Sequence, residues 1–556
     1  MKIICEQFKP RLGDLGFNAG SIIDKYNQGA TQGADVIIFT ELCVSGYIPK
    51  DLLFSKHFLQ GHNQCFSKIV DATKNKDTYL ILPTFKAKNN KLYNACYVIA
   101  DGEVVFKIYK QNLAKDSVFD EARYFSPSKS SNLTFKHKGV SIGLAICEDF
   151  WQANYYKKLA KQEPDLVVVV NASPYDVSKV STRLNTLQQR TKQLNKPVIY
   201  VNQVLAQDGI LYDGNSFVYD TSKTYINKNS FTEDTFACNF NKANSSLIID
   251  KKDLSKFEEV EQKNISKFNF SQIYKALVFG LKEYVYQSGF SKVLVGLSGG
   301  IDSALVATIA SDAFGSKNVK AIFMPSTFTT KQSFKDAEDT ATNLQIELKA
   351  ISIEELRLSY NSLIANLSPL AMENTQARIR GGILMAVSNS DGSLLLTTGN
   401  KSEIATGYCT LYGDMCGAYN PIKDLYKTEV FEVSKWRNNN ILDFMQCKKL
   451  NIINDSLLTK APSAELRENQ KDCDSLPDYP ILDQILYCLI EQRLSPQEAN
   501  TKLSSLEVFK DIKDLQGLID KVHKLFKISE YKRRQSALGT KISSLSFEPS
   551  DRRVNL

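Results

Sequence analysis

The chain has 556 residues, of which 43% are hydrophobic and 23% are charged, a composition typical of a soluble globular protein with more than one domain. Its net charge of +8 is spread along the whole length, which suits anionic substrates such as nucleotides but is too diffuse to indicate binding of DNA or RNA. No run approaches the roughly 18 apolar residues of a membrane span, so no membrane association is expected.

The first half alternates apolar, β-type runs with helical patterns, which predicts an α/β fold. A helix is predicted over residues 181–194. The predicted strands cover residues 36–40, 79–83, 95–100, 104–109, 141–147, 166–170, 198–202 and 216–219.

Cys147 ends one of these strands, directly before a helical pattern. A thiol at a strand-to-helix turn faces helix N–H groups, which favour the thiolate, so this position predicts a nucleophile. Most free cysteines are packing residues, and we expect the other ten to be so. The chain has only four histidines, none in a motif-like setting, so a carboxylate or a lysine must activate the thiol.

Two other strand ends supply suitable charges. Glu41 follows the strand 36–40, where burial would raise its pKa toward that of a general base. Lys110 follows the strand 104–109 and would hold positive charge beside a thiolate or a developing oxyanion. Glu, Lys and Cys in this order, each at a strand end, resemble the catalytic triad of the nitrilase superfamily.

The strings GDLGFN, VFDEARYF, CEDFW, NASPYDVSK and DGNSFVYD resemble the glutaminase branch of that superfamily, which is fused to NAD⁺ synthetases. The resemblance covers about residues 1–250 and implies an α-β-β-α sandwich that hydrolyses L-glutamine. It implies Glu41 as general base, Cys147 as the nucleophile that forms a glutamyl thioester, and Lys110 as stabiliser of the tetrahedral intermediate. The implied supporting residues are Glu121, which would position Lys110, and the glutamine contacts Asp116, Ser173 and Lys179.

The chain departs from the family pattern at two pairs. Asp116-Ser117 stands where a Tyr-Gly pair usually precedes VFDE, and Leu205-Ala206 stands where a Gly-Gly pair is usual. Because neither pair belongs to the triad, we expect altered glutamine affinity rather than lost activity.

A polar, charge-rich stretch over residues 250–267 separates the two halves. We therefore expect one domain over 1–250, a linker over 251–270 and a second domain over 271–556. The second half again alternates strands and helices, which predicts a doubly wound parallel sheet with ligands at the carboxyl ends of the strands. Its predicted elements cover residues 272–289, 304–314, 319–324, 335–344, 376–388, 394–398 and 428–438.

An apolar run in this half ends in Ser298-Gly299-Gly300, directly before a helical run. A strand, a glycine turn and a helix N-terminus together form a cradle for an anion such as phosphate. The Gly-Lys-Ser/Thr ending of a P-loop is absent. The string SGGIDS instead resembles the pyrophosphate loop of ATP pyrophosphatases, which split ATP into AMP and pyrophosphate while they adenylate a substrate.

Charged residues follow this loop where ATP chemistry would need them. Asp302 and Glu403 would hold Mg²⁺ on a triphosphate, and Lys423 and Lys427 would neutralise departing pyrophosphate. The segment 408–414 would cover the phosphates. Each residue taken singly also has an ordinary structural interpretation, and only their co-occurrence after SGGIDS favours the functional one.

The strings ENTQARIRG, LTTGNKSE, GYCTLYGD, KAPSAELRENQKDCDSLPDY and YKRRQ resemble the synthetase domain of NAD⁺ synthetases over essentially all of 270–556. The resemblance implies ATP-dependent adenylation of deamido-NAD, followed by displacement of AMP by ammonia. Its implied metal ligands are Asp302 and Glu403. Its implied ATP contacts are Gly296, Leu297, Ser298, Gly299, Gly300, Ile301, Asp302, Ser303 and Thr398, and its implied deamido-NAD contacts are Asn374, Glu403 and Lys532.

The two resemblances together imply a homo-oligomeric ligase that binds ATP, deamido-NAD and L-glutamine. The eleven cysteines without a Cys-x-x-Cys pair, and an N-terminus without a signal-peptide core, predict a reducing, cytoplasmic location. Two alternatives stay open. One is an amidotransferase of the same architecture that acts on nicotinate mononucleotide or another carboxylate, and the other is an inactive binding protein on the same folds. Glu41, Lys110, Cys147 and an intact SGGIDS loop disfavour the latter.

Overall fold

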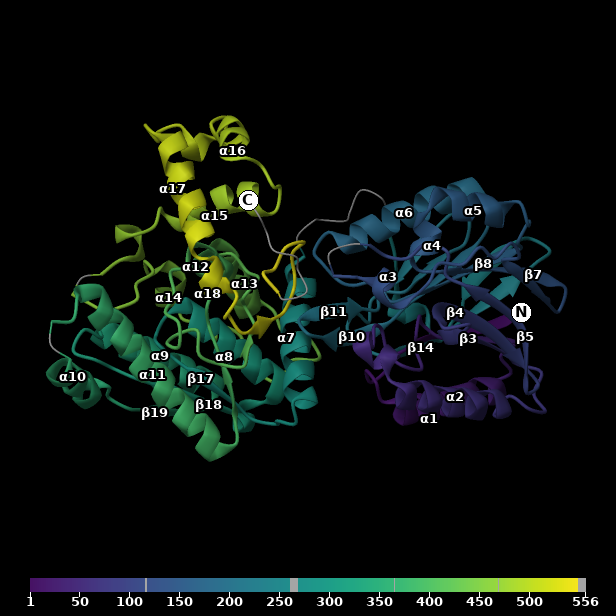
Figure 1. Ribbon diagram of the computed structural model, residues 1–556, viewed down its shortest axis with the longest axis horizontal. Coiled ribbons are helices and arrows are strands. Elements are labelled where there is room, and N and C mark those ends of the chain that lie inside the picture. Colours follow the sequence, from purple (N-terminus) through teal and green to yellow (C-terminus); the bar gives the residue numbers. More distant parts are fainter. Residues whose placement is uncertain (116–117, 261–268, 365, 469, 549–556) are drawn as a thin grey trace. The chain divides into compact units, whose positions relative to one another are not determined.

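The computed structural model describes residues 1–115, 118–260, 269–364, 366–468 and 470–548. The chain divides into two compact units (Figure 1). The first comprises Met1–Leu205 and Leu211–Phe268, and the second comprises Ala206–Ile210 and Asn269–Leu556. No helix among the described residues combines the length and the apolar character that crossing a membrane requires.

The first unit contains two seven-stranded sheets. In spatial order, one sheet consists of β15 (Ser246–Ile249), β14 (Asp234–Asn241), β1 (Lys2–Gln7), β2 (Val36–Ile38), β3 (Tyr79–Lys88), β4 (Lys91–Ala100) and β5 (Glu103–Tyr109). The other consists of β16 (Phe257–Glu259), β13 (Thr224–Asn227), β12 (Phe217–Tyr219), β9 (Val198–Asn202), β8 (Leu166–Asn171), β7 (Val140–Ile146) and β6 (Thr134–His137). A hairpin of β10 (Val204–Gln207) and β11 (Ile210–Asp213) pairs separately.

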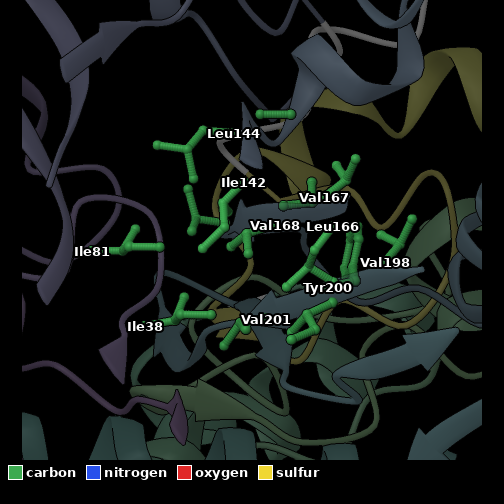
Figure 2. Packing of buried hydrophobic residues seen from close by; sticks show 14 of the residues in the cluster. Ile38, Ile81, Ile142, Leu144, Leu166, Val167, Val168, Val198, Tyr200 and Val201 are labelled. Carbon is green, nitrogen blue, oxygen red and sulfur yellow. The ribbon is translucent and has the colours of Figure 1, made fainter. Parts of the chain in front are cut away.

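The core of this unit lies between the two sheets. Ile38 and Ile81 of the first sheet belong to one buried cluster with Leu144, Val168 and Val201 of the second (Figure 2). Strands β7, β8 and β9 pair in parallel and are apolar almost throughout, as strands covered on both faces are.

Helices cover the outer faces of both sheets (Figure 1). Helices α1 (Leu15–Thr31) and α2 (Lys56–Asp71) lie on one side, and α5 (Ala153–Ala160) and α6 (Lys179–Leu194) lie on the other. The predicted α-β-β-α sandwich is confirmed. Short helical turns complete the unit: η1 (Lys50–Phe54), α3 (Glu121–Tyr124), α4 (Glu148–Trp151) and η2 (Leu254–Lys256).

The second unit contains a six-stranded parallel sheet. Its spatial order is β19 (Glu347–Ala350), β18 (Val319–Phe323), β17 (Val293–Gly296), β20 (Leu394–Leu396), β21 (Tyr419–Asn420) and β22 (Leu538–Gly539). The chain runs outward from β17 to β19 and then returns to the other side of β17. This reversal confirms the predicted doubly wound fold and places a topological switch point, the usual ligand position, between β17 and β20.

Helices pack on this sheet and form a separate helical cluster beside it. Helix α8 (Ile301–Phe314) packs against α7 (Phe270–Gln287) and α13 (Lys427–Asn439), while α11 (Pro369–Asp391) packs against β17 and β20. The helical cluster has its own core, which includes Leu486 and Ile519. The remaining helices are η3 (Ser316–Asn318), α9 (Lys331–Leu344), α10 (Glu354–Leu363), α12 (Lys401–Thr406), α14 (Asp455–Thr459), η4 (Asp472–Asp474), α15 (Tyr479–Ile490), α16 (Pro496–Leu503), η5 (Glu507–Phe509), α17 (Leu515–Ile528) and α18 (Glu530–Arg533).

Candidate active sites

Cys147 lies on the turn between β7 and the four-residue helix α4. Its backbone has φ 44° and ψ −105°, a conformation that residues other than glycine rarely adopt. Its N–H donates to the carbonyl of Val170 at 3.0 Å, which ties the turn to β8. The half-buried thiol is therefore held in a strained turn at the carboxyl edge of two parallel strands.

A fully buried cluster of charges surrounds the ammonium of Lys110. Its Nζ donates to Oε1 of Glu41 at 2.8 Å and to Oε1 of Glu121 at 2.9 Å, and none of the three side chains is exposed. The amide of Asn94 donates to Glu41 Oε1 at 2.7 Å, and the N–H of Ala172 donates to Glu41 Oε2 at 3.0 Å. These contacts fix both oxygens of Glu41 and hold the Lys110 ammonium between the carboxylates of Glu41 and Glu121.

The charges of this cluster act on Cys147. Burial and the negative charge of Glu41 raise the pKa of the Cys147 thiol well above its usual value, and Lys110 opposes them. Burial also raises the pKa of Glu41. Although burial disfavours the charge of Lys110, Glu121 and Glu41 raise the pKa of this ammonium well above its usual value. The resting site therefore pairs a neutral thiol with a carboxylate that accepts a proton readily.

The prediction that helix N–H groups favour the Cys147 thiolate is wrong for this resting site. Helix α4 has only four residues, and its first turn carries Glu148 and Asp149. Burial and the charges of Glu41, Glu121 and Glu148 instead raise the pKa of the thiol.

The glutamine contacts implied by the sequence fall at different places. Ser173 is buried just after β8, and its N–H donates to Oδ1 of Asn202 at 2.8 Å. Lys179 begins α6, with Nζ 5.1 Å from the ring centre of Trp151 in α4. Asp116 lies outside the described residues, as does Ser117. Leu205 and Ala206 are buried in β10.

In the second unit, the SGGIDS string forms the turn from β17 into α8. Gly299 has φ +78°, and a Cβ at this position would lie 2.1 Å from the carbonyl oxygen of Ser333, so only glycine fits. The N–H and the hydroxyl of Ser298 both contact the hydroxyl of Ser303, at 3.2 and 3.1 Å. The turn is thus closed on itself at the N-terminus of a 14-residue helix.

Two carboxylates meet beside this turn. Asp302 accepts from the amide of Asn400 at 3.0 Å and forms an ion pair with Lys427. Oε1 of Glu403 lies 3.7 Å from the same lysine, and its Oε2 caps α12 by accepting from the N–H of Asn400. Burial, followed by the charge of Asp302, raises the pKa of Glu403 to about 8.

A cavity of about 570 Å³ opens over these groups. Every residue that the family resemblance assigns to ATP or deamido-NAD lines it: Gly296–Ser303, Asn374, Thr398, Glu403 and Lys532. Asn374 accepts from the hydroxyl of Thr410 at 2.8 Å, and Lys532 donates to the carbonyls of Gly407 and Cys409, both at 2.7 Å. The cavity therefore gathers residues from positions almost 240 apart in the chain.

Of the two lysines expected near pyrophosphate, only Lys427 lines the cavity. Lys423 is buried elsewhere, where it pairs with Glu548 at 2.9 Å and donates to the carbonyl of Ala537 at 2.8 Å. Its predicted contact with pyrophosphate is wrong, since its ammonium already has partners away from the cavity.

Other polar residues line the cavity without having been singled out in the sequence. Lys460 donates to the hydroxyl of Ser333 at 2.7 Å, and Glu465 accepts from the same hydroxyl at 2.6 Å. Arg380 and Asp472 also lie on the wall. Lys460, Glu465 and Asp472 belong to the string KAPSAELRENQKDCDSLPDY, so its resemblance to the family pointed to the segment but not to the individual side chains.

Known proteins resemble both units. A family model described as carbon-nitrogen hydrolase matches residues 5–247, and one described as NAD synthase matches residues 273–536. The glutamine-dependent NAD(+) synthetase of Acinetobacter baylyi is 39% identical and spans 98% of this chain and 96% of that protein. The corresponding protein of Thermotoga maritima is 35% identical, with 98% and 97% covered. A solved structure of the Acinetobacter baumannii synthetase in complex with ADP is 35% identical, with a TM-score of 0.75 and coverage of 99% and 97%.

Proposed function

The chain belongs to the family of glutamine-dependent NAD(+) synthetases, and we propose that its two units divide the family's reaction between them. The protein is a ligase that uses glutamine as its nitrogen donor. In our proposal residues 1–250 release ammonia from glutamine, residues 271–556 amidate deamido-NAD, and residues 251–270 connect them, although β16 within that stretch still pairs with β13 of the first unit. The supporting observation is that each unit holds its own charge cluster: the fully buried Glu41–Lys110–Glu121 in one, and the partly buried Asp302–Glu403–Lys427 in the other.

Glutamine hydrolysis begins with a neutral thiol. As Sγ of Cys147 attacks the carboxamide carbon, Glu41 takes the thiol proton, and Lys110 stabilises the oxyanion that forms. The tetrahedral intermediate then collapses to a thioester, and ammonia leaves with the proton that Glu41 held. Glu41 next takes a proton from the water that attacks the thioester. The C–S bond breaks, glutamate leaves, and the proton passes from Glu41 to Sγ of Cys147. Ser173 and Lys179 bind the substrate, and position 116 contributes a third contact.

Amidation takes place in the cavity of the second unit. ATP binds with its phosphates at Gly296–Ser303 and contacts Thr398, and deamido-NAD contacts Asn374, Glu403 and Lys532. The nicotinate carboxylate attacks the α-phosphorus, pyrophosphate leaves, and Lys427 offsets the charge that leaves with it. Ammonia attacks the carbonyl of the adenylate, AMP leaves with the electron pair of the broken bond, and the nitrogen loses a proton to give the amide.

The residues beside the SGGIDS turn fit a magnesium ion carried by the nucleotide. Asp302 and Glu403 are close enough for their charges to raise the pKa of Glu403, so a cation between them would relieve that repulsion. Among the described residues no group of three or more His, Cys, Asp or Glu side chains is arranged to hold a metal alone. Two carboxylates plus phosphate oxygens are a usual magnesium site. The ion would there neutralise charge on the triphosphate.

A pair of variants tests the division of labour. Cys147→Ala should abolish NAD⁺ formation from glutamine yet keep it with ammonium chloride. Lys427→Met should lower NAD⁺ formation about 100-fold or more from both nitrogen sources, because a charge on the leaving group goes unbalanced, while glutamine hydrolysis persists. The assay measures NAD⁺, AMP, pyrophosphate and glutamate from ATP, deamido-NAD and each nitrogen source. NAD⁺ formation from glutamine by Cys147→Ala at the unmodified rate would contradict the proposal.

We also propose that the enzyme is a cytoplasmic homo-oligomer. All eleven cysteines are free thiols, which fits a reducing compartment. Sedimentation velocity with and without ATP measures the subunit number, and a monomer at micromolar concentration would contradict the oligomer.

A further inference from the structure

Asp149 lies two residues after Cys147, and its side chain has no exposed surface. Its Oδ1 accepts three hydrogen bonds: from the N–H of Gln111 at 3.0 Å, from the N–H of Asn112 at 2.8 Å and from the side-chain amide of Asn112 at 2.9 Å. Within the described residues, its Oδ2 accepts only from the N–H of Gln111, at 3.3 Å. One buried carboxylate therefore joins the turn of Cys147 to a segment from another sheet.

The joined segment is the one that directly follows Lys110. The backbone of Lys110 itself is still held by the sheet, because its N–H donates to the carbonyl of Asn94 in β4 at 2.8 Å. After Lys110 the chain leaves the sheet, and Asp149 binds the next two residues, Gln111 and Asn112. Further on, the N–H of Ala114 donates to Oε2 of Glu121 at 2.7 Å. The carboxylates of Asp149 and Glu121 thus both hold the segment that directly follows Lys110.

The bonds to Asp149 come from N–H groups rather than from a cation, since no ion pair within 4.0 Å involves this residue among the described parts of the chain. A salt-bridge role is thereby excluded, and a geometric role remains. Burial raises the pKa of Asp149 to about 7, which shows that keeping this carboxylate charged away from water costs free energy. The groups that face it are Lys110, which favours its charge, and Tyr155 of α5, whose pKa is raised by burial and by Asp149.

We propose that Asp149 is a positioning residue of the glutamine site: its Oδ1 fixes the segment after Lys110 against the turn of Cys147 and so sets where the lysine ammonium lies relative to the thiol. The inference rests on the proposed roles of Cys147 and Lys110. Without this acceptor the N–H groups of Gln111 and Asn112, which are partly buried, lose their partner, and the segment must shift to satisfy them. A shift of about 1 Å in a catalytic group is enough to slow a reaction roughly 100-fold.

The test compares Asp149→Ala with Asp149→Asn, which keeps an acceptor oxygen at the Oδ1 position. Asp253→Ala is the control, because this carboxylate is also buried in the first unit and accepts a backbone N–H, that of Ala237, at 2.9 Å, although unlike Asp149 it also pairs with a lysine, Lys256. The readouts are kcat and KM for glutamine hydrolysis, NAD⁺ formation from ammonium and thermal unfolding.

Asp149→Ala should lower kcat for glutamine about 100-fold while KM changes less than about 3-fold and ammonium-dependent synthesis stays unchanged. Asp149→Asn should restore kcat to within about 5-fold of the unmodified enzyme, since it recovers the acceptor. Asp253→Ala should lower the unfolding temperature without changing kcat. Should Asp149→Ala not fold, Asn112→Ala removes one donor from the opposite side and should lower kcat about 5-fold.

Three outcomes overturn the inference: an unchanged kcat in Asp149→Ala or, where that variant does not fold, in Asn112→Ala; an Asp149→Asn variant as slow as Asp149→Ala; or an equal loss of kcat in Asp253→Ala. Cys147→Ala separates this result from the proposed function. If Cys147→Ala is inactive toward glutamine while Asp149→Ala is fully active, the positioning role alone fails. If Cys147→Ala still hydrolyses glutamine, the proposed nucleophile itself fails.

Discussion

Lys110 and Glu41 form an ion pair from which solvent is excluded: Nζ lies 2.8 Å from Oε1, and neither side chain has exposed surface. The same ammonium lies 2.9 Å from Oε1 of Glu121, so one positive charge serves two buried carboxylates. Water does not screen these charges, and removing any one of them changes the balance for the others.

Replacing Lys110 by Met leaves Glu41 and Glu121 without their cation and should lower the free energy of unfolding by about 3–5 kcal/mol at pH 8. The loss should shrink at pH 5.5. Burial already raises the folded-state pKa of Glu41, and loss of Lys110 raises it further, so the stability of the variant is retained at low pH and lost as pH rises through that pKa.

Urea unfolding measures this effect, with Trp151 as the fluorescent reporter of the first unit in a Trp436→Phe background. Lys107→Met is the control, because Lys107 is an exposed lysine of β5, the strand that directly precedes Lys110, and it should change stability by less than about 0.5 kcal/mol. A loss in Lys110→Met that is the same at both pH values would contradict the account of the ion pair.

Replacing Glu41 by Gln should lower glutamine hydrolysis about 10²- to 10⁴-fold, because the general base is gone. The reactivity of the Cys147 thiol should move in the opposite direction. Since the charge of Glu41 raises the thiol pKa, its removal lowers that pKa and speeds alkylation by iodoacetamide at a fixed pH. Mass spectrometry of Cys147 follows the alkylation. If Glu41→Gln slows both glutamine hydrolysis and alkylation of Cys147, the substitution has disrupted the site as a whole, and the prediction is wrong.

The two glycines of the SGGIDS turn should respond differently to alanine. A Cβ at Gly299 would meet the backbone of Ser333 at 2.1 Å, whereas at Gly300 its nearest neighbour is the hydroxyl of Ser298 at 3.3 Å. Gly299→Ala should therefore destabilise the second unit by about 1–3 kcal/mol or more and impair ATP binding, and Gly300→Ala should cost less stability. Thermal unfolding of the two variants side by side measures the difference, and equal losses would be unexpected.

His62 should make the first unit less stable in mild acid. It is buried, stacks on Phe85 at 3.8 Å between ring centres, and lies 2.6 Å from the hydroxyl of Thr84. Burial lowers its pKa from 6.5 to about 4. The unfolded chain therefore takes up a proton at higher pH than the folded one, so this contribution is complete above about pH 6.5 and falls by up to about 3 kcal/mol toward pH 4.

The control for this prediction is His62→Phe, which keeps the stacking and removes the titration. Its free energy of unfolding should depend less steeply on pH between 6.5 and 4.5 than that of the unmodified protein. Parallel curves for the two proteins would show that His62 does not contribute to the acid response.

Long apolar runs made much of the fold predictable. The predicted strand at 166–170 is observed as Leu166–Asn171, and the helix at 181–194 as Lys179–Leu194, because each has a clear hydrophobic period. Strand β1 at Lys2–Gln7, inside a sheet, was not predicted. Its buried Glu6 and Gln7 interrupt the apolar run, and their burial depends on partners more than 200 residues away, such as Thr235 and Asn229.

The site was predictable where residues stand at strand ends, as Glu41, Lys110 and Cys147 do. The protonation state of Cys147 was not, since it depends on how deeply three distant segments bury one another's charges. The predicted contact of Lys423 with pyrophosphate was wrong for a related reason. Nothing in its neighbourhood along the chain indicates that Glu548, 125 positions later, pairs with its ammonium.

The proton that rests on Cys147 also bears on chemical durability. Peroxides and other oxidants attack thiolates far faster than thiols. Because burial and Glu41 raise the pKa of the half-buried Cys147 thiol, we expect it to resist conversion to sulfenic acid while no substrate is bound. Nucleophilic character then arises only when a carboxamide sits against the sulfur and the proton moves to Glu41. We therefore expect the buried charge of Glu41, which holds the proton on the thiol, also to protect the sulfur from oxidation between turnovers.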